Sequence, residues 1–184
     1  MTKFRRLQGL PVYGPMATGY PEEWARLGRE GLVVEFAGAD GATWVGNFRP
    51  GLGGLDDVRW HPNRQKVLVA SAGALWCVDP DTRVGEELAP AVFRIWQLES
   101  GDLLLDSQGL AYVRLGPSGV LWHTPRISWD GFQNVRLEAE QLAGEAWSPV
   151  EDRWLPFSVD LETGRIDGGS YNGPETRFDH LHAE

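Results

Sequence analysis

The sequence VRWHPNRQKVLVASAGALWCVDPDT, residues 58–82, decides the fold class. It holds three short apolar runs, VRW, KVLVA and ALWCV, and each run ends at a turn signal, HPN, SAG or DPDT. Short runs of β-branched and aromatic residues between Gly, Pro, Asn and Asp are typical of strands joined by tight turns. The stretch therefore predicts consecutive antiparallel strands.

The same pattern of short apolar runs separated by turn residues continues on both sides of this stretch. Upstream, LVVEFAG (32–38) and ATWVGNF (42–48) are separated by ADG, which predicts a hairpin with an Asp-Gly turn. Downstream, short apolar runs alternate with Gly-containing turns from residue 92 to residue 171. With Gly 23 and Pro 12, the chain is rich in the residues that allow sharp reversals. We expect an all-β fold.

One helix interrupts this pattern. YPEEWARLGREG (20–31) places Pro21 near a first helical position and two glutamates in the first turn. Trp24 and Leu27 would lie on one face, and Gly28 or Gly31 would end the helix. We expect a helix of about two turns.

The strand groups repeat along the chain. Three features recur at an offset of 36 residues: Trp60 and Trp96, SAG at 71–73 and SQG at 107–109, and Trp76 and Tyr112. In addition, WCVDPDT (76–82) matches FSVDLET (157–163) at an offset of 81. A short period built from strands and turns indicates stacked or radially repeated antiparallel sheets, because one unit cannot bury its apolar face alone.

Residues 58–82 and WLPFSVDLETGRIDGG (154–169) resemble single blades of β-propeller repeats, in which a final strand often ends in an Asp-x-(Asp/Glu)-Thr turn. The resemblance covers about residues 58–170 and implies a propeller-like or incomplete propeller arrangement, with a β-sandwich as the alternative. The chain departs from a WD40 array, since Trp-Asp occurs once, at Trp129-Asp130. Three or four units are also few for ring closure.

A second resemblance extends over the whole chain. EGLVVEF (30–36), WVGNF (44–48) and PRISWDGFQN (125–134) are similar to sequences of a family of uncharacterised bacterial proteins. That resemblance implies no activity. A length of 184 residues favours a single domain, 1–184, which we divide into an N-terminal segment with the helix (1–30), a β-repeat core (31–172) and a C-terminal tail (173–184).

Charge and composition restrict the partners. The net charge is −9, from 17 basic and 26 acidic residues, which disfavours nucleic acid and anionic membrane surfaces and favours encounter with a basic protein partner. No apolar run has the length of a signal peptide or a membrane span. The single cysteine, Cys77, lies in an apolar run and is expected to be an inert buried thiol. We expect a reduced, cytoplasmic protein.

Motifs for phosphate, dinucleotide, zinc or nucleophilic-elbow chemistry are missing from the sequence. We therefore expect no cofactor and no metal site. His61 precedes a Pro-Asn turn and is expected to end a strand, whereas His180 and His182 lie in the C-terminal tail.

The most chemically varied run is HTPRISWDGFQN, residues 123–134. One interpretation is a structural corner in which Arg126 pairs with Asp130 and Trp129 fills an apolar wall. The other is a recognition site in which Arg126 binds an anionic group and Trp129 stacks on a ring. Either way, this is where we look first for a site, with Arg126, Trp129, Asp130 and Trp147 as binding candidates.

Catalysis is the alternative. Glu145 and Trp147 alternate along a predicted strand and should share one face, and a catalytic pair would be His123 and Glu145. Carboxylates for a hydrolytic pair could come from Asp106, Glu145, Asp152 and Asp160, although Asp160 and Asp79 occupy equivalent turn positions and are more simply turn formers.

Three functions remain open. The preferred one is a non-catalytic binding protein, in one version an antitoxin- or immunity-type protein that neutralises a basic effector. The second is a hydrolase or carbohydrate-active protein with an aromatic-lined cleft. The third is a structural β scaffold in which the nine tryptophans serve only as core.

Overall fold

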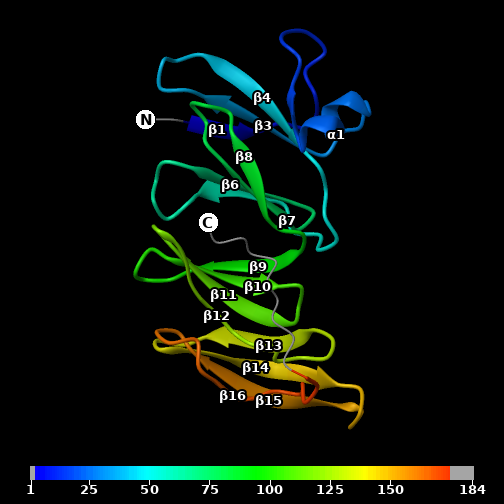
Figure 1. The fold of residues 1–184 in the computed structure, drawn as a ribbon, viewed down its shortest axis with the longest axis vertical. Helices are drawn as coiled ribbons and strands as arrows, with labels where there is room; N and C mark the ends of the chain where they lie inside the picture. The colour runs from blue at the N-terminus through cyan, green and yellow to red at the C-terminus, as the bar shows by residue number, and fades with distance from the viewer. Residues whose placement is uncertain (1–2, 175–184) are drawn as a thin grey trace. The chain divides into compact units, whose positions relative to one another are not determined.

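The structure is a computed structural model that describes residues 3–174. The chain divides into two compact units, residues 1–92 and 93–184. Each unit holds two four-stranded sheets, and antiparallel pairing dominates (Figure 1). The expected all-β fold of repeated antiparallel sheets with one short N-terminal helix is confirmed. That the chain behaves as a single domain stays a prediction, which a single calorimetric unfolding transition would support.

The first sheet of the N-terminal unit has the strand order β1-β3-β4-β2. The predicted hairpin is present as its centre, and Gly41 takes the positive φ of 80° that the Asp-Gly turn requires. β2 pairs parallel to β4 at the edge. The strands are β1 (Lys3–Arg6), β2 (Thr18–Tyr20), β3 (Leu32–Ala37) and β4 (Thr43–Phe48).

Two of these strands, β1 and β2, lie in the N-terminal segment, where the sequence predicted only the helix. Their sequences, KFRR and TGY, have no apolar alternation, so pairing with β3 and β4 rather than local propensity makes them strands. The helix itself is present and shorter than expected, as α1 (Glu22–Arg26). Trp24 is buried, whereas Leu27 follows the helix and is exposed.

The second sheet is a simple meander with the order β5-β6-β7-β8. Its strands are β5 (Asp57–Trp60), β6 (Val67–Ser71), β7 (Ala74–Val78) and β8 (Gly85–Ala89). Every residue of β6 and β7 is buried, as a continuous apolar run without alternation predicts for strands covered on both faces. The stretch 58–82 therefore forms the centre of the unit.

The two sheets of the N-terminal unit share one aromatic-rich core. Phe36 and Trp44 of the first sheet stack at 4.4 Å, Tyr20 stacks on Phe48 at 4.6 Å, and Trp76 of the second sheet lies 6.5 Å from Phe48. Such face-to-face packing of two sheets is common to neighbouring propeller blades and to β-sandwiches.

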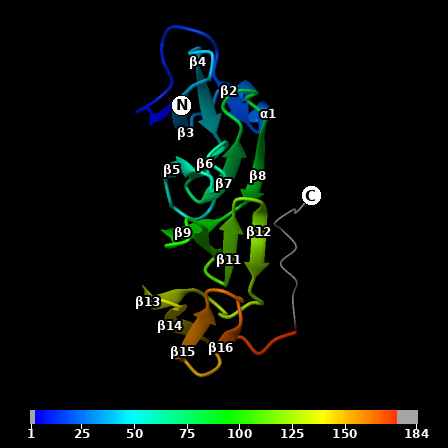
Figure 2. The same ribbon diagram turned by 90° about the vertical axis from the view of Figure 1, so that its left-hand side faces the viewer.

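The C-terminal unit repeats the design with two meanders, β9-β10-β11-β12 and β13-β14-β15-β16. Figure 2 labels β13, β14, β15 and β16 of the second meander as neighbours. The first meander consists of β9 (Val92–Gln97), β10 (Leu103–Ser107), β11 (Ala111–Gly116) and β12 (Gly119–His123). The second consists of β13 (Phe132–Leu137), β14 (Gln141–Ser148), β15 (Arg153–Asp160) and β16 (Ile166–Gly168).

The core of this unit lies between its two sheets. Tyr112 of β11 stacks on Phe132 at 4.9 Å and lies 5.9 Å from Phe157. A largely buried ion pair adds a polar link: Arg114 donates from Nε and Nη2 to Asp102, and from Nη1 to the carbonyl of Leu161 at 2.6 Å.

The offset of 81 residues marks a true structural repeat. Asp79 directly follows β7 and Asp160 is the last residue of β15, and the Oδ1 of each accepts a hydrogen bond from the N–H of the threonine three residues later, Thr82 or Thr163. The residues after these threonines, Arg83 and Gly164, both have positive φ values, 63° and 72°. Both aspartates are turn formers, as the sequence indicated.

The offset of 36 is only partly structural. The turns at 71–73 and 107–109 correspond, and both contain two consecutive residues of positive φ. However, β6 and β7 pair as Ser71 with Ala74, whereas β10 and β11 pair as Ser107 with Ala111, so the second turn is one residue longer. One added residue reverses the side-chain alternation. Trp76 thus faces the sheet before it in the chain, and Tyr112 faces the sheet after it.

In each unit an eight-residue connector joins one sheet to the next. The first connector, residues 49–56, and the second connector, residues 124–131, both hydrogen-bond to a tight turn of the central hairpin. Gly51, Gly53 and Leu55 bond to the 71–73 turn, and Ile127 and Gly131 bond to the 109–110 segment. The central hairpin turn is therefore the anchor for the connection between sheets.

Candidate functional site

The stretch 123–134 is the second connector with its flanking strand ends. Thr124, Ile127 and Ser128 are buried in it. The hydroxyl of Ser128 donates to the carbonyl of Gly131 at 2.6 Å and accepts from the N–H of Asp130 at 3.2 Å. Ser128 therefore holds the turn in front of Gly131, as expected of a serine in such a position.

Arg126 does not pair with Asp130, which corrects one expectation. Its Nε donates to the carbonyl of Ser128 at 2.8 Å and its Nη2 to the carbonyl of Trp129 at 2.6 Å. Its guanidinium lies 4.6 Å from the Tyr171 ring and 5.4 Å from the Trp129 ring. The planar fork fits two successive carbonyls of a tight turn, and Asp130 is left exposed. The guanidinium of Arg126 therefore binds carbonyl groups of its own connector.

Two residues that the sequence did not single out complete this corner. The hydroxyl of Ser170 donates to the carbonyl of Trp147 and accepts from the N–H of Trp129. Tyr171 packs on Trp129, with ring centroids 4.6 Å apart. The sequence signal for this contact was the GGSY run, residues 168–171. An added Cβ at Gly169 would lie 2.8 Å from the carbonyl oxygen of Ile127, so a side chain there would keep this run away from the second connector.

The side chain of Trp147 lies on the outer face of the last sheet. In β14 the core-facing residues are Leu142 and Ala146, so Glu145 and Trp147 share the outer face of the sheet, as predicted. Trp147 is paired with Trp154 across β15, at 5.2 Å between ring centroids. Glu145 accepts hydrogen bonds from the side chains of Gln133 at 2.9 Å and Asn134 at 2.7 Å.

The two residues of the catalytic alternative lie on different sheets. His123 is exposed at the end of β12, whereas Glu145 lies on the outer face of the other sheet, where amides hold it. Asp106 differs from the other carboxylates considered: it is 4 % exposed, and burial raises its pKa to about 6 against the opposing effects of the Gly109 N–H and Arg94. Asp152 lies in the turn before β15, and Asp160 is the last residue of β15, where it accepts from the turn that follows.

Two hollows lie at one end of the C-terminal unit. The larger, about 760 Å³, is lined by three turns: the one after β9, the one between β13 and β14, and the one after β15. Five carboxylates line it against a single guanidinium, that of Arg114: Glu99, Glu138, Glu140, Asp160 and Glu162. Within residues 3–174, no ion pair involves Glu99, Glu140 or Glu162. The hollow is therefore strongly acidic.

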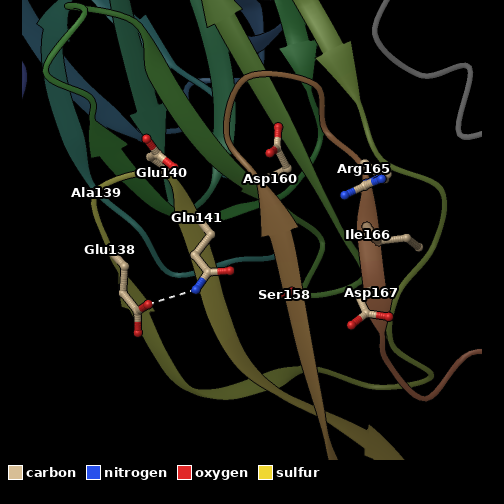
Figure 3. Close-up of a pocket in the computed structure, with 9 residues that line it drawn as sticks. All are labelled: Glu138, Ala139, Glu140, Gln141, Ser158, Asp160, Arg165, Ile166 and Asp167. Carbon is tan, nitrogen blue, oxygen red and sulfur yellow. Dashed lines mark hydrogen bonds between the residues drawn. The ribbon is translucent and has the colours of Figure 1, made fainter.

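The smaller hollow, about 460 Å³, shares Glu138, Glu140 and Asp160 with the larger one and extends toward Asp167 (Figure 3). Two of these carboxylates are held in the ionised form. Hydrogen bonds from the side chains of Arg136 and Gln141 lower the pKa of Glu138, and those from the hydroxyl and N–H of Thr163 lower the pKa of Asp160. The sequence had assigned Asp160 to turn formation and did not single out Glu138.

The remaining titratable candidates have structural roles. His61 is buried after β5, where its Nδ1 accepts from the N–H of Asn63, and burial lowers its pKa. Burial raises the pKa of the Cys77 thiol to about 11, in line with an inert buried thiol. His180 and His182 lie outside the described residues. Within residues 3–174, no three His, Cys, Asp or Glu side chains gather closely enough to hold a metal ion.

The nine tryptophans serve mainly in packing. Three are buried and six are half-buried. Across the described residues, no helix has the length and apolar character needed to cross a membrane. Comparison with known proteins finds no matching family model and no similar curated protein.

Proposed function

We propose that this protein is a non-catalytic binding protein whose C-terminal unit recognises a basic protein partner at the larger acidic hollow. The observation that carries the proposal is the set of carboxylates on three separate turns around one concavity. Lysine or arginine side chains of a partner would meet Glu99, Glu140 and Glu162 there without first displacing another cation from the described residues.

The single guanidinium in the lining supports this proposal. Arg114 is committed to Asp102 and to the Leu161 carbonyl, so its charge is compensated within the protein. The net charge of −9 would also speed the approach of a cationic partner, most strongly at low ionic strength. An antitoxin or immunity-type protein that neutralises a basic effector in the cytoplasm is the concrete form of this function.

A lysine peptide tests the proposal directly. Titration of the whole protein with nona-lysine at low salt should shift the amide resonances of 97–100, 137–140 and 160–162. The triple variant Glu99→Gln/Glu140→Gln/Glu162→Gln should weaken binding by about tenfold, equivalent to about 1.4 kcal/mol.

The matched control removes three exposed carboxylates from the N-terminal unit, as Glu22→Gln/Glu23→Gln/Glu86→Gln. This control should weaken binding by no more than about twofold, because it removes the same charge outside the hollow, including that of two exposed ion pairs, Glu22 with Arg26 and Glu86 with Lys66. Equal losses in the two triple variants, or no binding of nona-lysine, would overturn the proposal.

A further inference from the structure

The outer face of the last sheet runs from an aromatic pair to the acidic end of the unit. Cross-strand register defines it, since core residues alternate with outer ones along β14 and β15. Its successive outer pairs are Trp147 with Trp154, Glu145 with Pro156, Ala143 with Ser158, and Gln141 with Asp160. We call this surface the outer track.

The aromatic end of the outer track is available to solvent. Trp147 and Trp154 are half-buried, Pro156 is exposed, and neither indole N–H donates a hydrogen bond to another residue in the range 3–174. Other tryptophans of the chain, such as Trp44 and Trp122, donate theirs to carbonyls. The two indoles at this end thus present part of their ring surface and two N–H donors that bond to no described residue.

The other end of the outer track is continuous with the smaller hollow. Gln141, Ser158 and Asp160 belong both to the track and to the lining of that hollow, together with Asp167 of β16 (Figure 3). Glu145 lies between the two ends, with its carboxylate fixed by two amides. Carboxylates therefore outnumber guanidinium groups along this surface: Arg136, beside Ala143, is paired with Glu138, and Arg165 is the one basic side chain in the described lining of the smaller hollow.

We infer that the outer track binds an extended lysine- or arginine-rich segment of the basic partner, an inference that rests on the proposed function. Six residue steps separate Trp147 from Gln141, so the track spans about 20 Å, the length of about six extended residues. One cationic side chain would lie over the paired indoles, a second would meet Glu145, and a third would enter the acidic hollow.

The test uses the peptide Lys-Ala-Lys-Ala-Lys-Ala-Lys and the full chain, with Glu-Ala-Glu-Ala-Glu-Ala-Glu as the negative control. The lysine peptide should shift the indole N–H resonances of Trp147 and Trp154 as well as the amides of β14 and β15. Trp147→Ala/Trp154→Ala should weaken binding about fivefold, whereas Tyr13→Ala, which removes a 90 % exposed ring of the N-terminal unit, should leave it unchanged.

Glu145→Lys serves as a second variant if the double tryptophan variant loses its fold, and it should weaken binding by at least about fivefold. The inference is wrong if the triple variant Glu99→Gln/Glu140→Gln/Glu162→Gln weakens binding while the double tryptophan variant and Glu145→Lys do not. If that triple variant does not weaken peptide binding either, the proposed function fails as well.

Discussion

The two connectors perform the same task with different chemistry. The first connector, 49–56, has glycine at 51, 53 and 54 and bonds to the 71–73 turn through its backbone and through the Asp56 carboxylate, which accepts from the N–H of Ala72. The second connector, 124–131, also reaches its turn through backbone groups, but the side chains of Arg126 and Ser128 hold its own backbone in shape. A stretch rich in functional groups can therefore be the structural equivalent of a glycine loop.

This difference decides where a site is expected. The polar side chains of the second connector bond to the protein's own backbone, so their variety has a structural explanation. Glu99, Glu140 and Glu162 on the turns of the C-terminal unit, in contrast, take part in no ion pair within residues 3–174. Charged side chains that have no partner in the described part of the folded chain, rather than chemical variety in the sequence, indicate the binding surface.

The largest effect is expected from Gly51→Ala in the first connector. An added Cβ would lie 2.4 Å from both the Ala74 nitrogen and the Pro90 oxygen, which are backbone atoms that cannot move aside singly. We expect the free energy of unfolding in urea to fall by about 3 kcal/mol. The control is Gly9→Ala, whose nearest neighbour is the flexible Glu30 carboxylate at 3.2 Å, and which should cost less than about 1 kcal/mol. Equal costs for both would refute the backbone-contact explanation.

The hairpin turns that anchor the connectors also differ: Ala70 precedes the 71–73 turn, whereas Asp106, 36 residues later, precedes the 107–109 turn. The pKa of Asp106 is raised by burial to about 6, so the folded chain binds more protons than the unfolded chain between about pH 4 and pH 6. The free energy of unfolding should therefore fall as the pH rises through this window.

Asp106→Asn keeps an acceptor for the Gly109 N–H and removes the titration. We expect it to raise the free energy of unfolding at pH 7.5 by about 2 kcal/mol and to change it little at pH 4. Asp40→Asn, at an exposed turn, should alter neither value. A pH dependence that survives Asp106→Asn unchanged would assign the slope to another group.

Arg126→Met tests the second connector directly. It removes the donors to the Ser128 and Trp129 carbonyls and the contact with the Tyr171 ring. We expect a loss of about 2 kcal/mol in urea unfolding. Arg126→Lys should recover less than half of that loss, because an ammonium group lacks the planar fork. Full recovery by lysine would mean that charge alone matters.

The fold class was predictable because strand and turn signals agree over most of the chain. The equivalence of Asp79 and Asp160 also followed from sequence, since an Asp-x-x-Thr turn carries its own hydrogen bonds. The offset of Trp76 and Tyr112 misled, because a single added residue in a turn changes the face without changing the apparent repeat. The turns were predictable from their residues, whereas the face of the sheet on which a side chain lies was not.

The candidate site was predictable only in part. Alternation placed Glu145 and Trp147 on one face, which the structure confirms. The acidic hollow is assembled from turns separated by up to 65 residues, so no sequence window contains it. The partner of Arg126 was missed because carbonyl acceptors leave no trace in the sequence.

Ser170→Ala gives the smallest effect and the sharpest comparison of the connectors. The Ser170 hydroxyl joins the Trp129 N–H to the Trp147 carbonyl, so its removal should cost about 1 kcal/mol. Because Arg126 holds the carbonyl of the same Trp129, Ser170→Ala and Arg126→Met should be coupled by at least about 0.5 kcal/mol in a double-mutant cycle. Ser170→Ala and Gly51→Ala share no partner and should add within about 0.5 kcal/mol. Additivity in the first cycle would show that the second connector is held by independent contacts rather than as one hydrogen-bonded corner.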